Sequence, residues 1–157
     1  MATDDYEKTI RIDAAPDAVF DALTTTEGLT AWWTPADGSG TTGGELVFTM
    51  NAPSPCVMHV DEATRPAFVQ WTVTECDFEP DWVGTQPTFT ITPVDGGASS
   101  DVRFVHQGLT SELECIEVCR RGWDHFIPSL RDHVERGEGS PNGSPKDQAR
   151  RAAAAGQ

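Results

Sequence analysis

The sequence predicts an α+β domain in which one antiparallel sheet has a single apolar face and a long C-terminal helix covers that face. Between residues 43 and 107, several segments alternate apolar and polar residues, as strands with one buried side do. From about Ser111 to Arg136, apolar residues recur every three or four positions, which is typical of a helix with one buried stripe. A sheet with one apolar face needs a covering layer, and this helix can supply it.

The first third of the chain predicts one strand and two short helices. Residues 6–13 (YEKTIRID) alternate and are followed by Ala-Ala-Pro, so they read as the first strand. Residues 16–23 begin with Pro16, which is favourable at the first helical position. Residues 26–33 predict a second helix with Thr26 as its candidate N-cap.

The middle of the chain predicts a meander of five more strands. They are expected at 43–50, 56–60, 67–75, 88–92 and 101–107, each with one apolar side. The Gly-rich stretch between the last two strands is consistent with a hairpin.

The predicted terminal helix carries its apolar residues at spacings of three or four. These residues are Leu113, Ile116, Cys119, Trp123, Ile127, Leu130 and Val134. Pro128 lies inside the pattern and should kink the helix or thin its packing, because proline removes one backbone hydrogen bond. Residues 138–157 are rich in Gly, Ser, Pro and Ala and predict a disordered tail, so the domain is expected to span residues 1–137.

The composition restricts the partners that the protein can have. Eleven basic residues stand against twenty-five acidic ones, which gives a formal net charge of −14. Such a surface repels phosphates and anionic headgroups, so neither nucleic acid nor membrane insertion is expected. The chain has no membrane-spanning apolar run and its first residues do not resemble a signal peptide, so a cytoplasmic location is expected. The four cysteines form no CxxC pair and are expected to be structural thiols.

The stretch "LTAWWTP" (29–35) raises a question because it contains two adjacent tryptophans. Neighbouring side chains point about 100° apart on a helix and to opposite faces on a strand. Trp32 and Trp33 are therefore not expected at the centre of one core together. Either one ring is exposed, or the domain is hollow there and both rings line the hollow.

Four motifs in this order resemble a known superfamily. They are "WWTP", the "GG" that opens the next strand, "RFVHQGL" in the last strand and "GWDHFIPSLRDHVERG" in the terminal helix. Together they resemble the SRPBCC (START-like) superfamily, and within it the branch named after the activator of the heat-shock-protein-90 ATPase. The resemblance covers roughly residues 6–137. It implies a helix-grip fold, in which a curved antiparallel sheet wraps around a long C-terminal helix and encloses a cavity.

The resemblance also implies a class of function. Members of the superfamily bind sterols, lipids, polyketides and other apolar molecules, and some are cyclases, dehydratases or hydrolases. It places Trp32, His106, Trp123 and Ile127 near the cavity. The expected ligand-binding residues are Trp32, Trp33, Phe48, Met50, Met58, Trp71, Phe89, Phe104, His106, Trp123, Ile127 and Leu130.

Among the polar residues, His106 is the strongest candidate for a functional group. It is in register with Val102 and Phe104, so it should point to the buried face, either as a satisfied core histidine or as a group that orients a ligand or moves a proton. Glu75 is in phase with Trp71, so it could either approach the same region as an acid/base partner or lie only at the strand end. In contrast, His59 should face outward, and His125 and His133 lie off the apolar stripe and are expected to be solvated.

The expected function is the binding of an apolar or amphipathic small molecule between the sheet and the terminal helix. One alternative is a cyclase- or dehydratase-type enzyme with His106 as acid or base, and another is a co-chaperone-like interaction module. A homodimer is a further possibility, on the assumption that a tryptophan beside the short helices is exposed. No catalytic nucleophile is expected, because no GxSxG elbow is present. "DGSGTTGG" (37–44) opens a strand and not a helix, so it is no phosphate-binding loop, and no organic cofactor is expected. No metal site is expected either, because Cys115 and Cys119 lie one helical turn apart without further ligands nearby.

Overall fold

The computed structural model describes residues 5–49, 55–76, 79–110 and 116–155. In chain order the strands are β1 (Tyr6–Ile12), β2 (Ala36–Gly38), β3 (Glu45–Phe48), β4 (Cys56–Thr64), β5 (Phe68–Cys76), β6 (Gln86–Val94) and β7 (Ser99–Gln107). The α-helices are α1 (Pro16–Thr24), α2 (Thr26–Trp32), α3 (Ile116–Arg136) and α4 (Pro145–Ala155), and 3₁₀ turns lie at Pro80–Trp82 and Asp95–Gly97.

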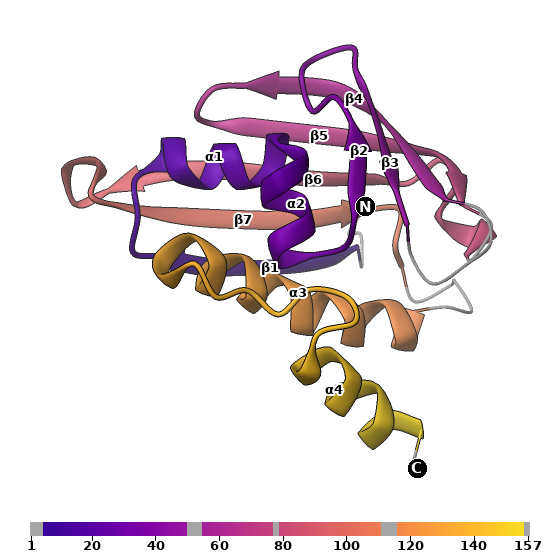
Figure 1. The fold of residues 1–157 in the computed structure, drawn as a ribbon. Coiled ribbons are helices and arrows are strands. Elements are labelled where there is room, and N and C mark those ends of the chain that lie inside the picture. Colours follow the sequence, from indigo (N-terminus) through magenta and orange to yellow (C-terminus); the bar gives the residue numbers. More distant parts are fainter. Residues whose placement is uncertain (1–4, 50–54, 77–78, 111–115, 156–157) are drawn as a thin grey trace.

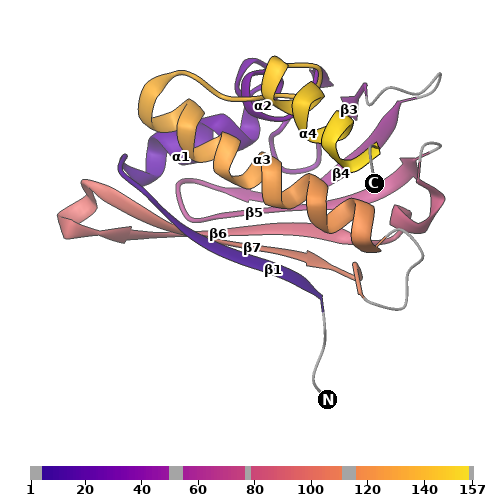
Figure 2. The same cartoon turned by 90° about the horizontal axis from the view of Figure 1, so that it is seen from below.

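The strands form one antiparallel sheet in the order β1-β7-β6-β5-β4-β3-β2. The helices lie on one face of it, with α3 running along the sheet (Figures 1 and 2). The prediction of an α+β helix-grip fold is confirmed. The sequence did not reveal β2, because three residues are too few to show alternation.

The sheet and α3 bury one continuous core. Along β7, the side chains of Val102, Phe104 and His106 are buried while Arg103 between them is exposed, as the alternation predicts. On α3, the side chains of Cys119, Trp123, Phe126, Ile127 and Leu130 are buried. The helix continues through Pro128. The predicted start of this helix, with the candidate capping pair Ser111 and Glu114, lies outside the described residues.

A register shift between β4 and β5 changes which side chains of β5 point inward. Val73 pairs with Met58 and Glu75 pairs with Val57, so Thr74 is an extra residue in the ladder. Val73 and Cys76 are buried, whereas Thr74 and Glu75 are exposed. The prediction that Glu75 approaches the core is therefore wrong, because strict alternation breaks at this bulge.

The N-cap of helix α2 lies one residue earlier than predicted. The Thr25 hydroxyl accepts a hydrogen bond from the Gly28 amide at 3.0 Å, so Thr25 and not Thr26 is the N-cap. The helix ends at Trp32, and Trp33 has the non-helical angles φ −120° and ψ −80°.

The segment predicted as a disordered tail contains α4, and that prediction is wrong. The Ser144 hydroxyl accepts from the Asp147 amide at 3.3 Å, and the Asp147 carboxylate accepts from the Gly143 amide at 2.9 Å, so both groups cap the start of α4. The segment before α4 packs on the domain, since the backbone N–H of Asn142 donates to the Trp33 carbonyl at 2.5 Å. None of the described helices is both long and apolar enough to span a bilayer.

Candidate functional site

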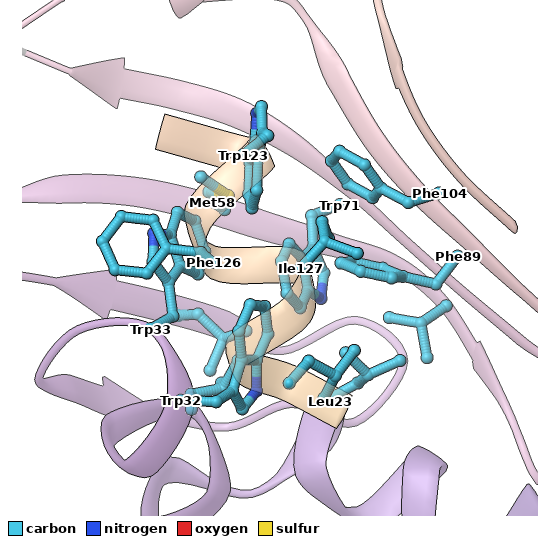
Figure 3. Close-up of a cluster of buried hydrophobic side chains, with 14 of the residues drawn as sticks. Leu23, Trp32, Trp33, Met58, Trp71, Phe89, Phe104, Trp123, Phe126 and Ile127 are labelled. Atoms are coloured by element: carbon cyan, nitrogen blue, oxygen red, sulfur yellow. The ribbon is translucent and has the colours of Figure 1, made fainter. Parts of the chain in front are cut away.

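A cluster of aromatic side chains fills the space between the sheet and α3 (Figure 3). We call it the ring cluster and define it as Trp32, Trp33, Phe48, Trp71, Phe89, Phe104 and Trp123. Eleven of the twelve predicted ligand-binding residues are at most 4% exposed and belong to, or contact, this one core; they include Met58, His106, Ile127 and Leu130. The twelfth, Met50, lies outside the described residues. The sequence therefore predicted correctly that these eleven residues belong to the core, and ligand contact by them stays a prediction.

The two adjacent tryptophans both point inward. Trp32 is the last helical residue, and its indole N–H donates to the Ala22 carbonyl at 2.8 Å. Trp33 has already left the helix, so the 100° rotation between helical neighbours does not apply to it. The two rings stack with centroids 5.8 Å apart. The expectation that the two rings do not share one core is wrong, because both belong to the same buried cluster. The alternative of an exposed ring is wrong too, since Trp32 is 0% and Trp33 is 4% exposed.

Trp33 is the centre of the ring cluster. Its ring centroid lies 4.6 Å from that of Phe48, 4.9 Å from Trp123, 5.8 Å from Trp32 and 6.1 Å from Trp71. The Trp33 and Trp71 planes are nearly parallel, at 9°. These separations are those of favourable aromatic pairs, so the rings contact one another directly.

One polar group in the ring cluster lacks a partner. Trp71 is fully buried, and no hydrogen-bond acceptor lies within reach of its indole N–H among the residues that the structure describes. The neighbouring side chains are the rings of Trp33, Phe48 and Phe89. A buried donor without an acceptor costs roughly 1–3 kcal/mol, so this N–H would favour any acceptor brought next to it.

His106 is buried at the β7 side of the cluster with both ring nitrogens engaged. Trp123 Nε1 donates to His106 Nδ1 at 3.0 Å. Because Nδ1 accepts, the neutral ring carries its proton on Nε2, which donates to Thr85 Oγ1 at 2.7 Å. The Thr85 hydroxyl then donates to the Trp82 carbonyl at 2.6 Å. The chain of donors and acceptors is complete.

This environment holds His106 neutral. Burial lowers the pKa of His106 from 6.5 to about 3, because the protonated ring would lose its hydration and would have no acceptor for a second N–H. In this arrangement neither nitrogen can take up or release a proton without breaking the network. The geometry gives His106 the role of fixing the Trp123 ring, and the hypothesis of an acid/base pair with Glu75 fails because Glu75 is exposed on the other face.

A family model described as Activator of Hsp90 ATPase homolog 1-like protein matches residues 13–135, nearly the whole described domain. The chain belongs to this family. It is also similar to the solved Aha1 dimer from Colwellia psychrerythraea, with 28% identity over 88% of this chain and all of that one, and a TM-score of 0.74.

Other solved structures share the fold of this family member. A protein from Bacillus halodurans is 25% identical over 83% of this chain and 96% of its own, with a TM-score of 0.65. An Hsp90 activator from Plasmodium falciparum is 18% identical over 84% of this chain and 95% of its own, with a TM-score of 0.67. A search of curated proteins gave no match.

Several site residues of this Hsp90-activator-like domain escaped prediction. Thr85 was missed because a threonine in a loop between predicted strands gives no signal of contact with His106, 21 positions away. Phe126 lies beside the predicted α3 stripe and is nevertheless buried, under the Arg150 guanidinium of α4. Tyr6 donates to the Asp124 carboxylate at 2.5 Å, which joins β1 to α3. These contacts depend on tertiary packing and left no local pattern.

Of the three other histidines, His59 is exposed as predicted, whereas His125 and His133 are less exposed than predicted. His59 lies near Asp61. His125 and His133 are half-buried instead of solvated, because the segment after α3 folds over them: His125 Nε2 lies 2.9 Å from the Ser140 carbonyl. Burial lowers the pKa of His133. Among the described residues, no three His, Cys, Asp or Glu side chains group as a metal site would require.

Proposed function

We propose that the protein binds a small, mostly apolar molecule between the sheet and α3, at the ring cluster. The observation that carries the proposal is the fully buried Trp71 N–H, which has no acceptor among the described residues and is surrounded by aromatic rings. Ligand sites are mostly apolar with a few polar groups that orient the ligand, and this donor is such a group. The family resemblance to binders of lipids, sterols and polyketides supports the same class.

The shape of the cluster favours a flat aromatic ligand with a hydrogen-bond acceptor. Trp33 stacks on Trp71 with nearly parallel planes, so an aromatic ring that takes the place of Trp33 can stack on Trp71 in the same way. The rings are in contact, so a ligand must displace one of them. Trp33 is the best candidate for that movement, because it lies outside helix α2 and is the most exposed ring of the cluster.

The enzymatic alternative receives less support. It needs His106 to exchange a proton, whereas both His106 nitrogens are engaged and its pKa is lowered to about 3. We therefore assign His106 a positioning role, in which it holds Trp123 against the cluster. The co-chaperone alternative is supported by the family description and stays open to a pull-down with the chaperone.

A homodimer is a second part of the proposal. The 28% identical structure from Colwellia psychrerythraea is described as a dimer, and we propose the same state for this chain. The earlier reason for a dimer, an exposed tryptophan, is wrong. Among the described residues, Val83 is the large hydrophobic side chain that stands out as exposed, at 50%.

Native mass spectrometry of freshly purified protein is the first test. We expect a co-purifying small molecule, recovered by solvent extraction, and the mass of two chains. Anthraquinone and anthracene then make a matched pair of probes, because only the first carries acceptor oxygens. We expect Trp71→Phe to weaken anthraquinone binding about 5- to 10-fold, the equivalent of one hydrogen bond, and to leave anthracene binding nearly unchanged.

Trp32→Phe is the matched control for this experiment. It removes the same indole N–H from a donor that is already satisfied by Ala22. We expect it to lower stability more than Trp71→Phe does, without discriminating between the two probes. An apo spectrum together with no binding of either probe would contradict the proposal, and partner binding would replace it.

A further inference from the structure

The thiols of Cys56 and Cys76 lie opposite each other in the sheet. Cys56 is the first residue of β4 and Cys76 is the last residue of β5, and the two are register partners. Both side chains are buried, at 0% and 3% exposure. Directly opposed residues in an antiparallel pair have Cα atoms about 4.5–5.5 Å apart, and disulfides span about 4.4–6.8 Å between Cα atoms. Register partners such as Cys56 and Cys76 therefore have Cα separations within the range that a disulfide spans.

The bulge in β5 creates this juxtaposition. Val69, Trp71 and Val73 point into the core, so strict alternation would place Glu75 inside and Cys76 outside. The extra residue Thr74 shifts the phase and turns Cys76 inward, onto the face of Cys56. The side chain of Cys76 hydrogen-bonds the Cys56 thiol, and this bond, followed by burial, raises the pKa of Cys56. The two sulfurs therefore meet.

We propose that Cys56 and Cys76 are a modification site, a thiol pair that a small-molecule disulfide such as oxidised glutathione converts to a disulfide between β4 and β5. One cysteine thiolate attacks the oxidant and releases one molecule of glutathione. The second cysteine loses its proton and attacks the sulfur of the resulting mixed disulfide, which forms the Cys56–Cys76 bond and releases the second glutathione. The protein loses two electrons and two protons, and the oxidant gains them.

The position of the pair at strand ends gives the oxidant access. Strand ends open locally at a lower free energy than strand centres, so opening of the first residue of β4 and the last of β5 exposes a sulfur without global unfolding. Cys119 is placed differently: it lies within α3, where its sulfur accepts from Trp82 Nε1 at 3.1 Å.

The test uses the double variant Cys115→Ser/Cys119→Ser, in which Cys56 and Cys76 are the two cysteines that the sequence retains. A serine hydroxyl at 119 can still accept from Trp82. After incubation of the folded protein with oxidised glutathione, we expect the intact mass to fall by about 2 Da, the mass of two hydrogens. We expect the equilibrium constant for disulfide formation with oxidised glutathione to be at least about tenfold larger in the folded chain than in guanidinium, because folding holds the two thiols together.

Cys56→Ser in the same background is the control, and it should gain a glutathione adduct instead of losing mass. A folded double variant that stays fully reduced, or that accumulates only glutathione adducts, would overturn the proposal. If the double variant does not fold, a non-reducing peptide map of the oxidised wild-type protein tests the proposal instead. A linked pair of peptides with Cys56 and Cys76 supports the site, and any other dominant pairing refutes it.

Discussion

Two buried polar side chains in the same core show how individual residues differ in function. His106 has an acceptor for its N–H and a donor for its lone pair, so its burial is compensated by hydrogen bonds. The Trp71 N–H has no such compensation among the described residues. The first arrangement stabilises the fold, and the second is the basis of the proposed ligand site. In the sequence pattern, both residues were expected on the buried face of the sheet.

The neutral state of His106 predicts a loss of stability in mild acid. The ordinary pKa of 6.5 applies to the unfolded chain and about 3 to the folded chain, so between these values the unfolded state binds a proton that the folded state does not. Stability is fully present above pH 6.5 and falls as the pH decreases towards 3. Between pH 7 and pH 5, His106 should account for about 2 kcal/mol of lost unfolding free energy, measured by urea denaturation.

His106→Gln tests the origin of this loss. A glutamine amide offers an acceptor and a donor, so it can partly replace the bonds to Trp123 and Thr85 without titrating. We expect the variant to be less stable at pH 7 but to lose about 2 kcal/mol less than the wild type on going to pH 5. An unchanged pH dependence would show that His106 is accessible to protons in the folded state.

At the scale of elements, the segment after α3 holds the tryptophan pair in place. The Ser129 hydroxyl of α3 donates to the Trp32 carbonyl at 2.8 Å and accepts from the Ser140 amide at 2.6 Å. The Asn142 amide donates to the carbonyl of Trp33. Three separate elements therefore meet at the end of α2, where helical carbonyls need partners from outside the helix.

Ser129→Ala should be strongly destabilising. Ser129 is 2% exposed, and its loss leaves the Trp32 carbonyl and the Ser140 amide without this shared partner. At roughly 1–3 kcal/mol for each buried group, we expect the unfolding free energy to fall by about 2–4 kcal/mol, measured by urea denaturation.

A chain truncated after residue 137 supplies the control. It lacks Ser140, so Ser129→Ala should cost about 1–2 kcal/mol less in the truncated chain than in the full chain. An equal cost in both chains would mean that the terminal segment does not pack on α3 in solution.

For the whole molecule, the dominant long-range force is repulsion between carboxylates. The formal charge is −14. The exposed ion pairs of Arg11 with Asp101, Arg65 with Asp17, and Arg103 with Glu7 offset only part of it. Each exposed ion pair contributes at most about 1 kcal/mol. Screening by salt should therefore weaken the repulsion among the carboxylates by more than it weakens the attraction within the ion pairs.

Added salt should therefore stabilise the protein at neutral pH. From about 0.01 M to 0.15 M KCl, the Debye length falls from about 30 Å to about 8 Å, and we expect the Tm to rise by roughly 3 °C or more. Near pH 4.4, the isoelectric point of the sequence, the net charge vanishes and the salt effect should nearly disappear. A Tm that falls with salt at pH 7 would mean that the ion pairs outweigh the net repulsion.

Helix α4 was missed in the sequence, although the sequence contains local signs of it. Gly, Ser and Pro between residues 137 and 145 suggested disorder. However, "SPKD" (144–147) combines a cap residue, a proline at the first helical position and an acidic residue in the first turn. Those local signs were sufficient to predict that α4 exists. The contact of its Arg150 with Phe126, and that of the preceding Asn142 with the Trp33 carbonyl, had no local sign.

The sequence by itself determined six of the seven strands, the long helix and most of the core, because burial imposes a period of two on strands and of 3.6 on helices. Those periods survive wherever the backbone is regular. Tertiary structure alone decided the features that depend on irregular backbone or on contacts between distant segments. The turn at Trp33 brings two adjacent rings to one side, and the bulge at Thr74 removes Glu75 from the core and turns Cys76 towards Cys56. One residue out of phase reverses the direction of a side chain, and no local pattern reports where that residue will fall.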